Sequence, residues 1–556
     1  MRFWLLLVSA LLGASVIADG AARPMVLPSP IELDTREAHD LITPLRFDAE
    51  RYSALKDVRG SVILRGFPIN RTVSADLLLE RFDVLPSNAS VVIGSDVGDI
   101  PIERPDVVLL RGTIDGQTKS SVYLGLSPWG CNGWLMLDDD LYFVSAGSRT
   151  NNRSLHIYRV EDMPSYWLRS DWFCDADSLL PNGLAGHTNS DVVIADDCGG
   201  KLASVAVETD WEFTGSLFGG NTSASGAYVV TLFGAVDFIY RRDFGVAVNV
   251  PYMRLWSNSN DPWNQNNTSN QLDQFRTYWT QNMQNIYRTV AHFLSGRALG
   301  GGVAWMSVLC NYGYGYGLSA NLAGFFPPGL EPGPNNWDPF VVTHEIGHNF
   351  GAPHTHEMFP PVDTCGLGCN DPPFVGTIMS YCHICPGGMS NIRLEFHPRT
   401  IEVVQNYLRG VGCLSSAVLT CNVALQEYQG TAPLMGYVEL RKSGTGDLEA
   451  LRSVVYQDGR FGMNSPLLCE HDVSVKFPTF LRKTIPSVMI LPPETILNFA
   501  MLNGDANNDN VVDIRDLNIM LSRFGMTGQG DVNYNGVVDV SDISVVLINF
   551  GLAGDF

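Results

Sequence analysis

A run of fourteen residues, 341–354, limits the possible folds of this chain more than any other segment, and it reads VVTHEIGHNFGAPH. Its apolar first residues are typical of the start of a buried helix. On a helix, His344 and His348 lie one turn apart and face the same side, so both imidazoles can reach one metal ion. Glu345 is then placed to hold a water molecule on that ion. The run therefore predicts a metal site on a helix.

Two further residues extend this site. Gly351 can adopt a backbone conformation closed to other residues, which would turn the chain so that His354 supplies a third nitrogen. Three protein ligands leave a fourth position for water, the arrangement of a catalytic zinc rather than a structural one. A bare His-Glu-x-x-His pattern arises by chance, as a surface or core histidine pair, but all five positions coincide in about one chain in ten thousand or fewer. The pattern therefore predicts catalytic Zn²⁺.

A second motif, residues 376–382, reads GTIMSYC. Following the three histidines, it resembles the metzincin family, in which a methionine lies beneath the histidines, and Met379 holds that position. Residues 347–356 and 376–383 are similar to the reprolysin (adamalysin) branch and its bacterial relatives, and the resemblance covers about residues 200–413. It implies a zinc metalloendopeptidase with an α/β catalytic domain. Zinc would polarise the scissile carbonyl and acidify its bound water, while Glu345, as general base, would pass the proton to the leaving amine.

Two residues depart from the branch pattern. Thr355 stands where many adamalysins have Asp. Tyr381 lies two residues after Met379, as in astacins and serralysins, and this resemblance makes it a candidate catalytic helper that stabilises the oxyanion. His356 and His383 are expected at the surface or around the site, because three histidines and water already complete a tetrahedral zinc.

The chain contains 11 cysteines, which in an exported protein indicate disulfides. Within the resemblance, Cys310 and Cys413 are spaced like a disulfide of the reprolysin branch. Four further cysteines form a cluster: Cys365, Cys369, Cys382 and Cys385. Two disulfides within this cluster, with three possible pairings, are expected in preference to a structural zinc site.

The odd cysteine count leaves at least one thiol without an intramolecular partner. We hypothesise that such a thiolate occupies the open zinc position of a latent precursor, since thiolate is a strong zinc ligand. Cys174 and Cys198 are the candidates, because both lie near the expected end of a propeptide. An ordinary disulfide is the alternative for each.

Export is predicted by residues 1–18, where Arg2 precedes an apolar run and Val16 and Ala18 occupy the −3 and −1 positions of a cleavage site. This run is too short for a membrane anchor. We therefore expect a secreted protein, extracellular or attached to a cell surface, with no membrane span after cleavage. The formal net charge of −22 argues against nucleic-acid binding.

A chain of this length predicts several domains. The fold class expected is multidomain: a β-rich, propeptide-like domain over residues 19–195, an α/β metzincin catalytic domain over 196–415, a small β-sandwich over 418–500 and an α-helical, dockerin-like tail over 503–553. Within the catalytic domain, strands are expected at 203–209, 228–233, 245–251 and 302–309, and helices at 272–294 and 338–350.

The tail contains an internal repeat of 26 residues. Oxygen ligands at EF-hand-type positions predict two Ca²⁺ loops, formed by Asp505, Asn507, Asp509, Val511, Asp513 and Asp516 and by Asp531, Asn533, Asn535, Val537, Asp539 and Asp542. The valines would contribute backbone carbonyls. The repeat resembles type I dockerins, which implies a cohesin-like partner. Helical spacing predicts that two short helices bury against each other through Leu517, Leu521, Phe524, Ile543, Leu547 and Phe550.

Two classes of function follow from these features. An active endopeptidase acting on protein or peptide substrates is favoured, because Glu345 and the three histidines are all present. The alternative is a catalytically inactive, peptidase-fold adhesin or scaffold-binding protein. The sequence does not identify the substrate.

Overall fold

The computed structural model describes residues 24–555 with internal gaps, which are residues 38, 59, 87–88, 96–97, 139, 149–153, 165–167, 169–172, 175–200, 327–336, 371, 415–417, 445, 466–468 and 491–493. The expected signal peptide and Cys198 lie outside the described residues.

The N-terminal part of the chain forms a sheet of ten strands, in the order β1 (Met25–Pro28), β4 (Ser61–Pro68), β5 (Ser74–Phe82), β8 (Val108–Ile114), β9 (Ser120–Ser127), β10 (Gly130–Leu137), β11 (Asp140–Ser145), β12 (His156–Arg159), β3 (Thr43–Phe47) and β2 (Ile31–Leu33). Alternate residues point to opposite faces. Thus Val122 and Leu124 belong to one apolar core, whereas Tyr123 belongs to another. Both faces of the sheet are therefore covered, one of them near helix α1 (Ala49–Lys56).

A second sheet has nine strands, in the order β13 (Phe173–Cys174), β18 (Gly301–Ala304), β19 (Tyr316–Ser319), β17 (Val290–Leu294), β14 (Lys201–Thr209), β16 (Tyr252–Trp256), β6 (Ser90–Gly94) and β7 (Ile100–Pro101), with β15 (Val246–Asn249) paired to β14. Three of these strands, β6, β7 and β13, come from the N-terminal part of the chain. The division expected at residue 195 therefore does not separate the two sheets.

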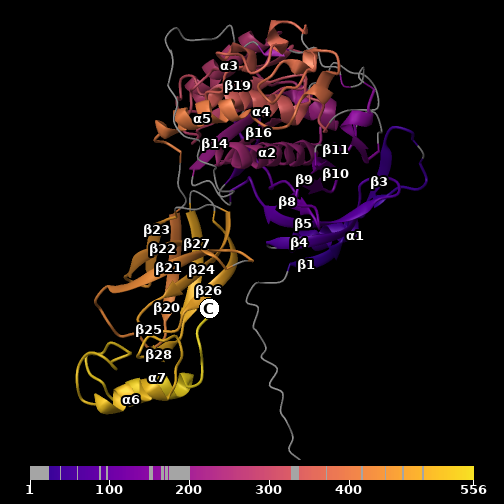
Figure 1. Cartoon of the computed structure of the whole chain (residues 1–556). Helices are drawn as coiled ribbons and strands as arrows, with labels where there is room; N and C mark the ends of the chain where they lie inside the picture. The colour runs from indigo at the N-terminus through magenta and orange to yellow at the C-terminus, as the bar shows by residue number, and fades with distance from the viewer. Residues whose placement is uncertain are drawn as a thin grey trace, which may run out of the picture.

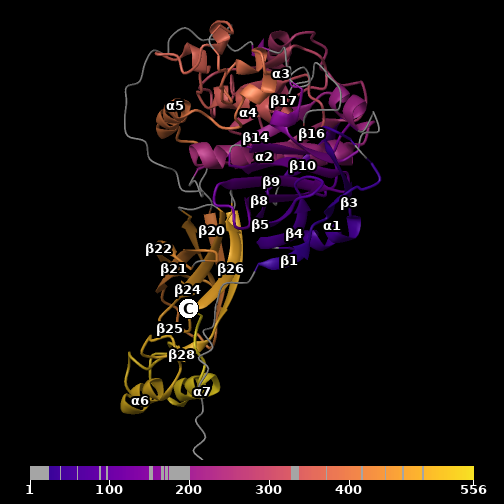
Figure 2. The same ribbon diagram turned by 45° about the vertical axis from the view of Figure 1, so that its right-hand side comes forward.

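Helix α2 (Thr222–Phe244) lies between the two sheets (Figures 1 and 2). It is long and apolar enough to span a membrane, but 83% of its most apolar stretch is buried inside the protein. A helix that is apolar on every side is one that packs on every side. Helices α3 (Thr268–Asn282), α4 (Asp338–Asn349) and α5 (Pro398–Arg409), together with a π-helix at Phe213–Leu217, complete this domain.

Two expectations for this domain are wrong, and the strand expected at 302–309 is only partly correct because β18 ends at Ala304. Residues 228–233, predicted as a strand, lie inside helix α2. The helix predicted over 272–294 ends at Asn282, and the chain then forms strand β17 (Val290–Leu294). Strands β14 and β15 and helix α4 agree with the predicted segments.

Beyond Cys413, two sheets enclose one apolar core. One has the order β23 (Arg460–Asn464), β20 (Val418–Leu425), β27 (Glu494–Met501), and the other β22 (Leu448–Tyr456), β21 (Leu434–Lys442), β24 (Cys469–Lys476), β26 (Lys483–Ile490). Strands β25 (Thr479–Phe480) and β28 (Asn503–Asp505) then pair and lead to the tail. The tail helices are α6 (Ile514–Ser522) and α7 (Val540–Asn549), drawn in yellow in Figure 1.

The predicted core of the tail is partly wrong. Leu521, Phe524, Leu547 and Phe550 are each about half exposed. The buried cluster is instead built largely from short side chains, namely Val512, Met520, Val532, Val538, Val545 and Val546 with Leu481 and Ala506. Leu517 and Ile543 pack against its edge, as expected.

Candidate active site

Helix α4 carries the first two histidines and directs them to one point. The Nε2 atom of His348 lies 3.2 Å from the Nε2 atoms of both His344 and His354. His344 Nδ1 donates to the carbonyl of Ile378 at 2.6 Å, and His348 Nδ1 donates to the carbonyl of Ala352 at 2.8 Å. Because the Nδ1 atoms are engaged with carbonyls, the Nε2 lone pairs face one another.

The turn after α4 brings in the third histidine. Gly351 has a φ of +87°, a conformation that favours glycine, as the sequence predicted. Its amide donates to the carbonyl of His348 at 2.8 Å. His344, His348 and His354 are all fully buried. Burial first, and then the neighbouring His348 and His354, hold the pKa of His344 well below its usual value. The ring is therefore neutral, which is the form that binds a metal.

Met379 lies against the last turn of α4, beside the histidines, as its motif predicted. It is fully buried, and a Cβ on Gly347 of α4 would come within 3.0 Å of its Sδ. The carbonyl of Met379 accepts hydrogen bonds from the amide of Thr355 at 3.0 Å and from its hydroxyl at 3.2 Å. Thr355, the departure from the branch pattern, thus joins the residue after His354 to the methionine turn.

Glu345 lies beside the histidines, under strand β18. A Cβ on Gly302 would lie within 2.5 Å of Glu345 Cγ and still closer to the carboxylate. Only glycine leaves this space, so Gly302 sets the position of the glutamate. Sequence reasoning missed Gly302, since nothing near it in the chain marks this contact.

Cys174 enters the site from the N-terminal part of the chain. Its Sγ lies 3.4 Å from Glu345 Oε2 and 3.4 Å from His348 Nε2. The thiol is buried, and together with the three histidines it forms a group whose ligand atoms all lie within 4.8 Å of one another. Cys174 takes part in none of the disulfides among the described residues. The structure therefore brings one of the two candidate thiols to the metal ligands.

Tyr381 also reaches this cysteine. Its hydroxyl donates to the backbone carbonyl of Cys174 at 2.9 Å, and its ring lies 4.6 Å from that of His354. His356 stacks on His354 with ring centroids 5.4 Å apart, and it lies outside the group of converging Nε2 atoms. His383 is fully buried, 5.6 Å from the ring of Phe340.

These residues fit a zinc ion. Three imidazoles converge through Nε2. Carbonyls fix the rings of His344 and His348, and His354 Nδ1 lies 3.3 Å from Glu357 Oε2. The Glu345 carboxylate, which is not one of the converging ligands, lies beside them. This is the donor set of a catalytic zinc, with the Cys174 thiol as a further donor.

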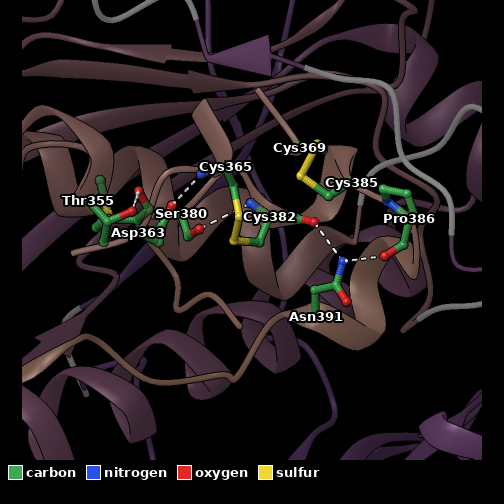
Figure 3. Close-up of a disulfide and its surroundings, with 10 residues drawn as sticks. Thr355, Asp363, Cys365, Cys369, Ser380, Cys382, Cys385, Pro386 and Asn391 are labelled. Atoms are coloured by element: carbon green, nitrogen blue, oxygen red, sulfur yellow. Dashed lines mark hydrogen bonds between the residues drawn. A yellow bond between two sulfur atoms is a disulfide. The ribbon is translucent and has the colours of Figure 1, made fainter. Parts of the chain in front are cut away.

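The described residues of the chain form three disulfides. Cys310 pairs with Cys413, as the resemblance implied, and the cluster pairs as Cys365–Cys382 and Cys369–Cys385. Figure 3 shows the last two beside the turn that follows Met379. There Asn391 Nδ2 donates to the carbonyls of Cys382 at 2.9 Å and Pro386 at 3.1 Å. The Cys365–Cys382 and Cys369–Cys385 disulfides therefore hold in place the segment that carries Tyr381.

The tail residues predicted as calcium ligands form two similar loops. Asp505 accepts from the amide of Asn510 at 3.0 Å, and Asp531 accepts from the amide of Gly536 at 2.9 Å. Asp516 and Asp542, fully buried, each accept from backbone amides of their own loop. The remaining predicted ligands are half-buried or exposed, except Asn533 at 1%. Asp513 and Asp539 act as N-caps of α6 and α7.

The first loop differs from the second by a lysine from the preceding module. Lys476 Nζ donates to Asp505 Oδ2 at 2.7 Å, and both side chains are buried. The other oxygen of that carboxylate, Oδ1, is buried with no hydrogen-bond partner among the described residues. Burial raises the pKa of Asp516, and the charges of Asp505 and Asp509 raise it further. The loop therefore concentrates negative charge that a cation would neutralise.

Comparison with known proteins agrees with this geometry. The family model Reprolysin_5, described as metallo-peptidase family M12, matches residues 201–393. No curated protein matches the chain. Among solved structures, metalloproteinase-II from Bacteroides fragilis has 11% identity and a TM-score of 0.36, covering 69% of this chain and 98% of that one. Two interface mutants of a type II Cohesin-X-Dockerin complex from Acetivibrio cellulolyticus each have 18% identity and a TM-score of 0.21, covering 25% of this chain and 97% of theirs.

Neither structural likeness is strong enough to carry an assignment. The family match includes α4, the three histidines, Met379 and Tyr381. It supports a metallopeptidase domain over residues 201–393, and family M12 implies zinc and protein substrates.

Proposed function

We propose that this chain is a secreted, zinc-dependent endopeptidase of the reprolysin-like metzincin type, made as a latent precursor and attached to a partner through a calcium-binding tail. The observation that carries the proposal is the convergence of the Nε2 atoms of His344, His348 and His354 beside Glu345. The family match over the same residues supports it.

Glu345 is the proposed general base. A bound zinc ion would supply Lewis-acid chemistry, polarising the scissile carbonyl and making water acidic. Glu345 would accept the proton of the attacking water and return it to the nitrogen of the leaving amine as the C–N bond breaks. Its carboxylate suits this role because burial and Gly302 fix its position.

Tyr381 is proposed to assist peptide hydrolysis after the segment that carries Cys174 has moved out of the active site. Its hydroxyl donates to the backbone carbonyl of Cys174, so with that residue displaced it can donate to a substrate carbonyl whose oxygen gains negative charge. The Tyr381→Phe variant is expected to reduce kcat of the processed enzyme while the zinc content stays the same.

Latency is proposed to depend on Cys174. A thiolate at this position would be a fourth zinc ligand and would exclude water from the place where Glu345 activates it. Strand β13, which carries the cysteine, pairs with β18 in parallel through Phe173 with Gly301 and Cys174 with Gly302. The cysteine is therefore held beside β18 as well as at the metal ligands.

The tail is proposed to bind two calcium ions and a cohesin-like partner. Support comes from the two loops and from apolar residues that are exposed at equivalent places of the repeat, namely Ile514 and Val540, Leu521 and Leu547, and Phe524 and Phe550. Such side chains contribute little to the core of the tail and are available to a partner.

The alternative is an inactive peptidase-fold adhesin or scaffold-binding protein, which would have the same tail but would not hydrolyse peptide bonds. Zinc content, measured by elemental analysis, distinguishes the ligand residues from their neighbours. The His348→Ala variant is expected to lose the metal. The matched control is His356→Ala, which removes an imidazole stacked on His354 and should keep one zinc per chain. Equal zinc in both variants would contradict the proposed ligand set.

A further inference from the structure

We propose that the N-terminal domain, defined as residues 24–164, stays bound to the catalytic domain, defined as residues 201–413, after the chain between Cys174 and Lys201 is cut. The mature enzyme would then be a complex of two chains. The inference rests on the proposed function only in assuming that the precursor is processed there.

The two domains share a sheet. Strand β6 (Ser90–Gly94) pairs in parallel with β16 (Tyr252–Trp256) along its whole length. Backbone hydrogen bonds extend the contact, from Ser90 to the carbonyl of Pro251 at 2.9 Å and from Val250 to that of Val84 at 2.7 Å. Loss of the N-terminal domain would turn β16 into an uncovered edge, with buried amides and carbonyls left without partners.

The two domains also share a hydrophobic core. Leu109, Tyr123 and Trp134 of the first sheet belong to the same buried cluster as the apolar residues of α2. The Tyr123 hydroxyl donates to the carbonyl of Thr231, and the Trp134 ring lies 5.6 Å from that of Phe238.

Small residues allow this close approach. A Cβ on Gly234 would lie 2.5 Å from the Tyr123 hydroxyl and 2.9 Å from Leu109. A Cβ on Gly125 would overlap the side chain of Thr231. One face of α2 is therefore shaped to fit the first sheet, and without that sheet it would expose apolar residues to water.

Polar contacts cross the same interface. Arg254, whose side chain is 4% exposed, forms an ion pair of 2.8 Å with Asp99 of the N-terminal domain. Tyr252 also donates to Asp99. The amide of Phe326 donates to Asn132 Oδ1 at 3.0 Å. Separation of the domains would break these contacts and would leave the largely buried Arg254 paired with Glu208 at 3.7 Å and with the Tyr278 hydroxyl at 3.2 Å.

Contact through β13 is much smaller. Among the described residues it comprises two residue pairs with β18, the contacts of the Cys174 thiol and one hydrogen bond from Tyr381. Just before β13, the carbonyl of Leu168 accepts a hydrogen bond from the amide of Met389 at 2.8 Å. These contacts can be released while the α2 and β16 interface remains. Activation would then displace the short segment around Cys174 and leave the rest of the N-terminal domain in place.

The test uses the full chain with a site-specific protease sequence inserted between residues 175 and 200. Glu345→Gln serves as the background, so that self-digestion does not complicate the result. After cleavage, size-exclusion chromatography in native buffer should show both fragments in one peak, and denaturant should separate them. A folded catalytic fragment that elutes alone in native buffer would overturn the proposal. Neither outcome depends on peptide hydrolysis, so failure here is distinct from failure of the proposed function.

A matched pair of variants tests the interface itself. Asp99→Ala removes the carboxylate that pairs with Arg254 across the interface and should raise the dissociation constant of the cut fragments at least about tenfold. Asp162→Ala removes a carboxylate whose ion pair, with Arg159, lies within the N-terminal domain, and should leave that constant unchanged. Equal dissociation constants for the two variants would overturn the interface described.

Discussion

Gly302→Ala is expected to disable the active site without removing its metal ligands. An alanine Cβ at this position would lie within 2.5 Å of Glu345 Cγ, whereas ordinary contact begins at about 3.4 Å. The glutamate side chain must therefore move by about 1 Å, because pairing with β19 holds β18 in place. A misplacement of about 1 Å in a catalytic group costs about 100-fold in rate, or about 2.7 kcal/mol.

The assay compares kcat/KM of the processed wild type and of Gly302→Ala on a quenched fluorescent peptide. Zinc content is measured in parallel and should stay at one ion per chain, since no histidine moves. Gly412→Ala is the control, because no atom lies within 4 Å of its added Cβ, and it should retain full activity. If Gly302→Ala keeps kcat/KM within about threefold of wild type, the glycine does not set the position of Glu345 and our reasoning fails.

Three further predictions concern latency, the tail and pH. Cys174→Ala should raise the peptidase activity of the uncleaved precursor by about tenfold or more, since loss of one metal ligand is worth at least about 1.4 kcal/mol; the peptide assay measures it. Lys476→Met should destabilise the metal-free tail by about 3 kcal/mol, because Asp505 loses its buried counter-charge, and thermal unfolding in the presence of chelator measures this effect. The same variant should bind calcium more tightly at the first loop, which calorimetry measures. Burial raises the pKa of Glu208 from 4.5 to about 7, so the folded state binds that proton more tightly than the unfolded state. The free energy of unfolding should therefore fall as pH rises from about 4.5 to about 7, and Glu208→Gln should flatten that slope of Tm against pH.

Each of these predictions has an outcome that contradicts it. Unchanged precursor activity in Cys174→Ala would remove the thiol from the account of latency. Lys483→Met, which removes an exposed lysine paired with Asp555, is the control for Lys476→Met, and identical behaviour of the two would refute a special role for Lys476. A slope of Tm against pH that is the same in Glu208→Gln and wild type would show that Glu208 keeps an ordinary pKa in the fold.

The sequence predicted the metal ligands because they are local. His344, His348 and His354 lie within eleven residues, and the geometry of one helix and one glycine turn brings them together. Cys174 and Gly302 lie far from them in the chain. Gly302 carries no local signal, and Cys174 was one of two candidates that only the fold could distinguish.

Errors in the predicted elements have physical causes. Residues 228–233 have an apolar, β-branched composition typical of a strand, and helix α2 shows little apolar periodicity because sheets cover it on both sides. In the tail, Leu521 and Phe524 have helical spacing but are exposed, since the small core is filled largely by valines from the loops and from α7. Periodicity identified these helices but not which apolar residues they bury.

The central claim is that Glu345 and a zinc ion held by three histidines cleave peptide bonds. The most direct measurement is the cleavage of a denatured protein by the processed chain, compared with processed Glu345→Gln at equal zinc content. We expect one zinc per chain in both, with fragments of the substrate formed by the wild type and none by Glu345→Gln. Equal cleavage by both, or no cleavage by a processed wild type that holds its zinc, would contradict the account.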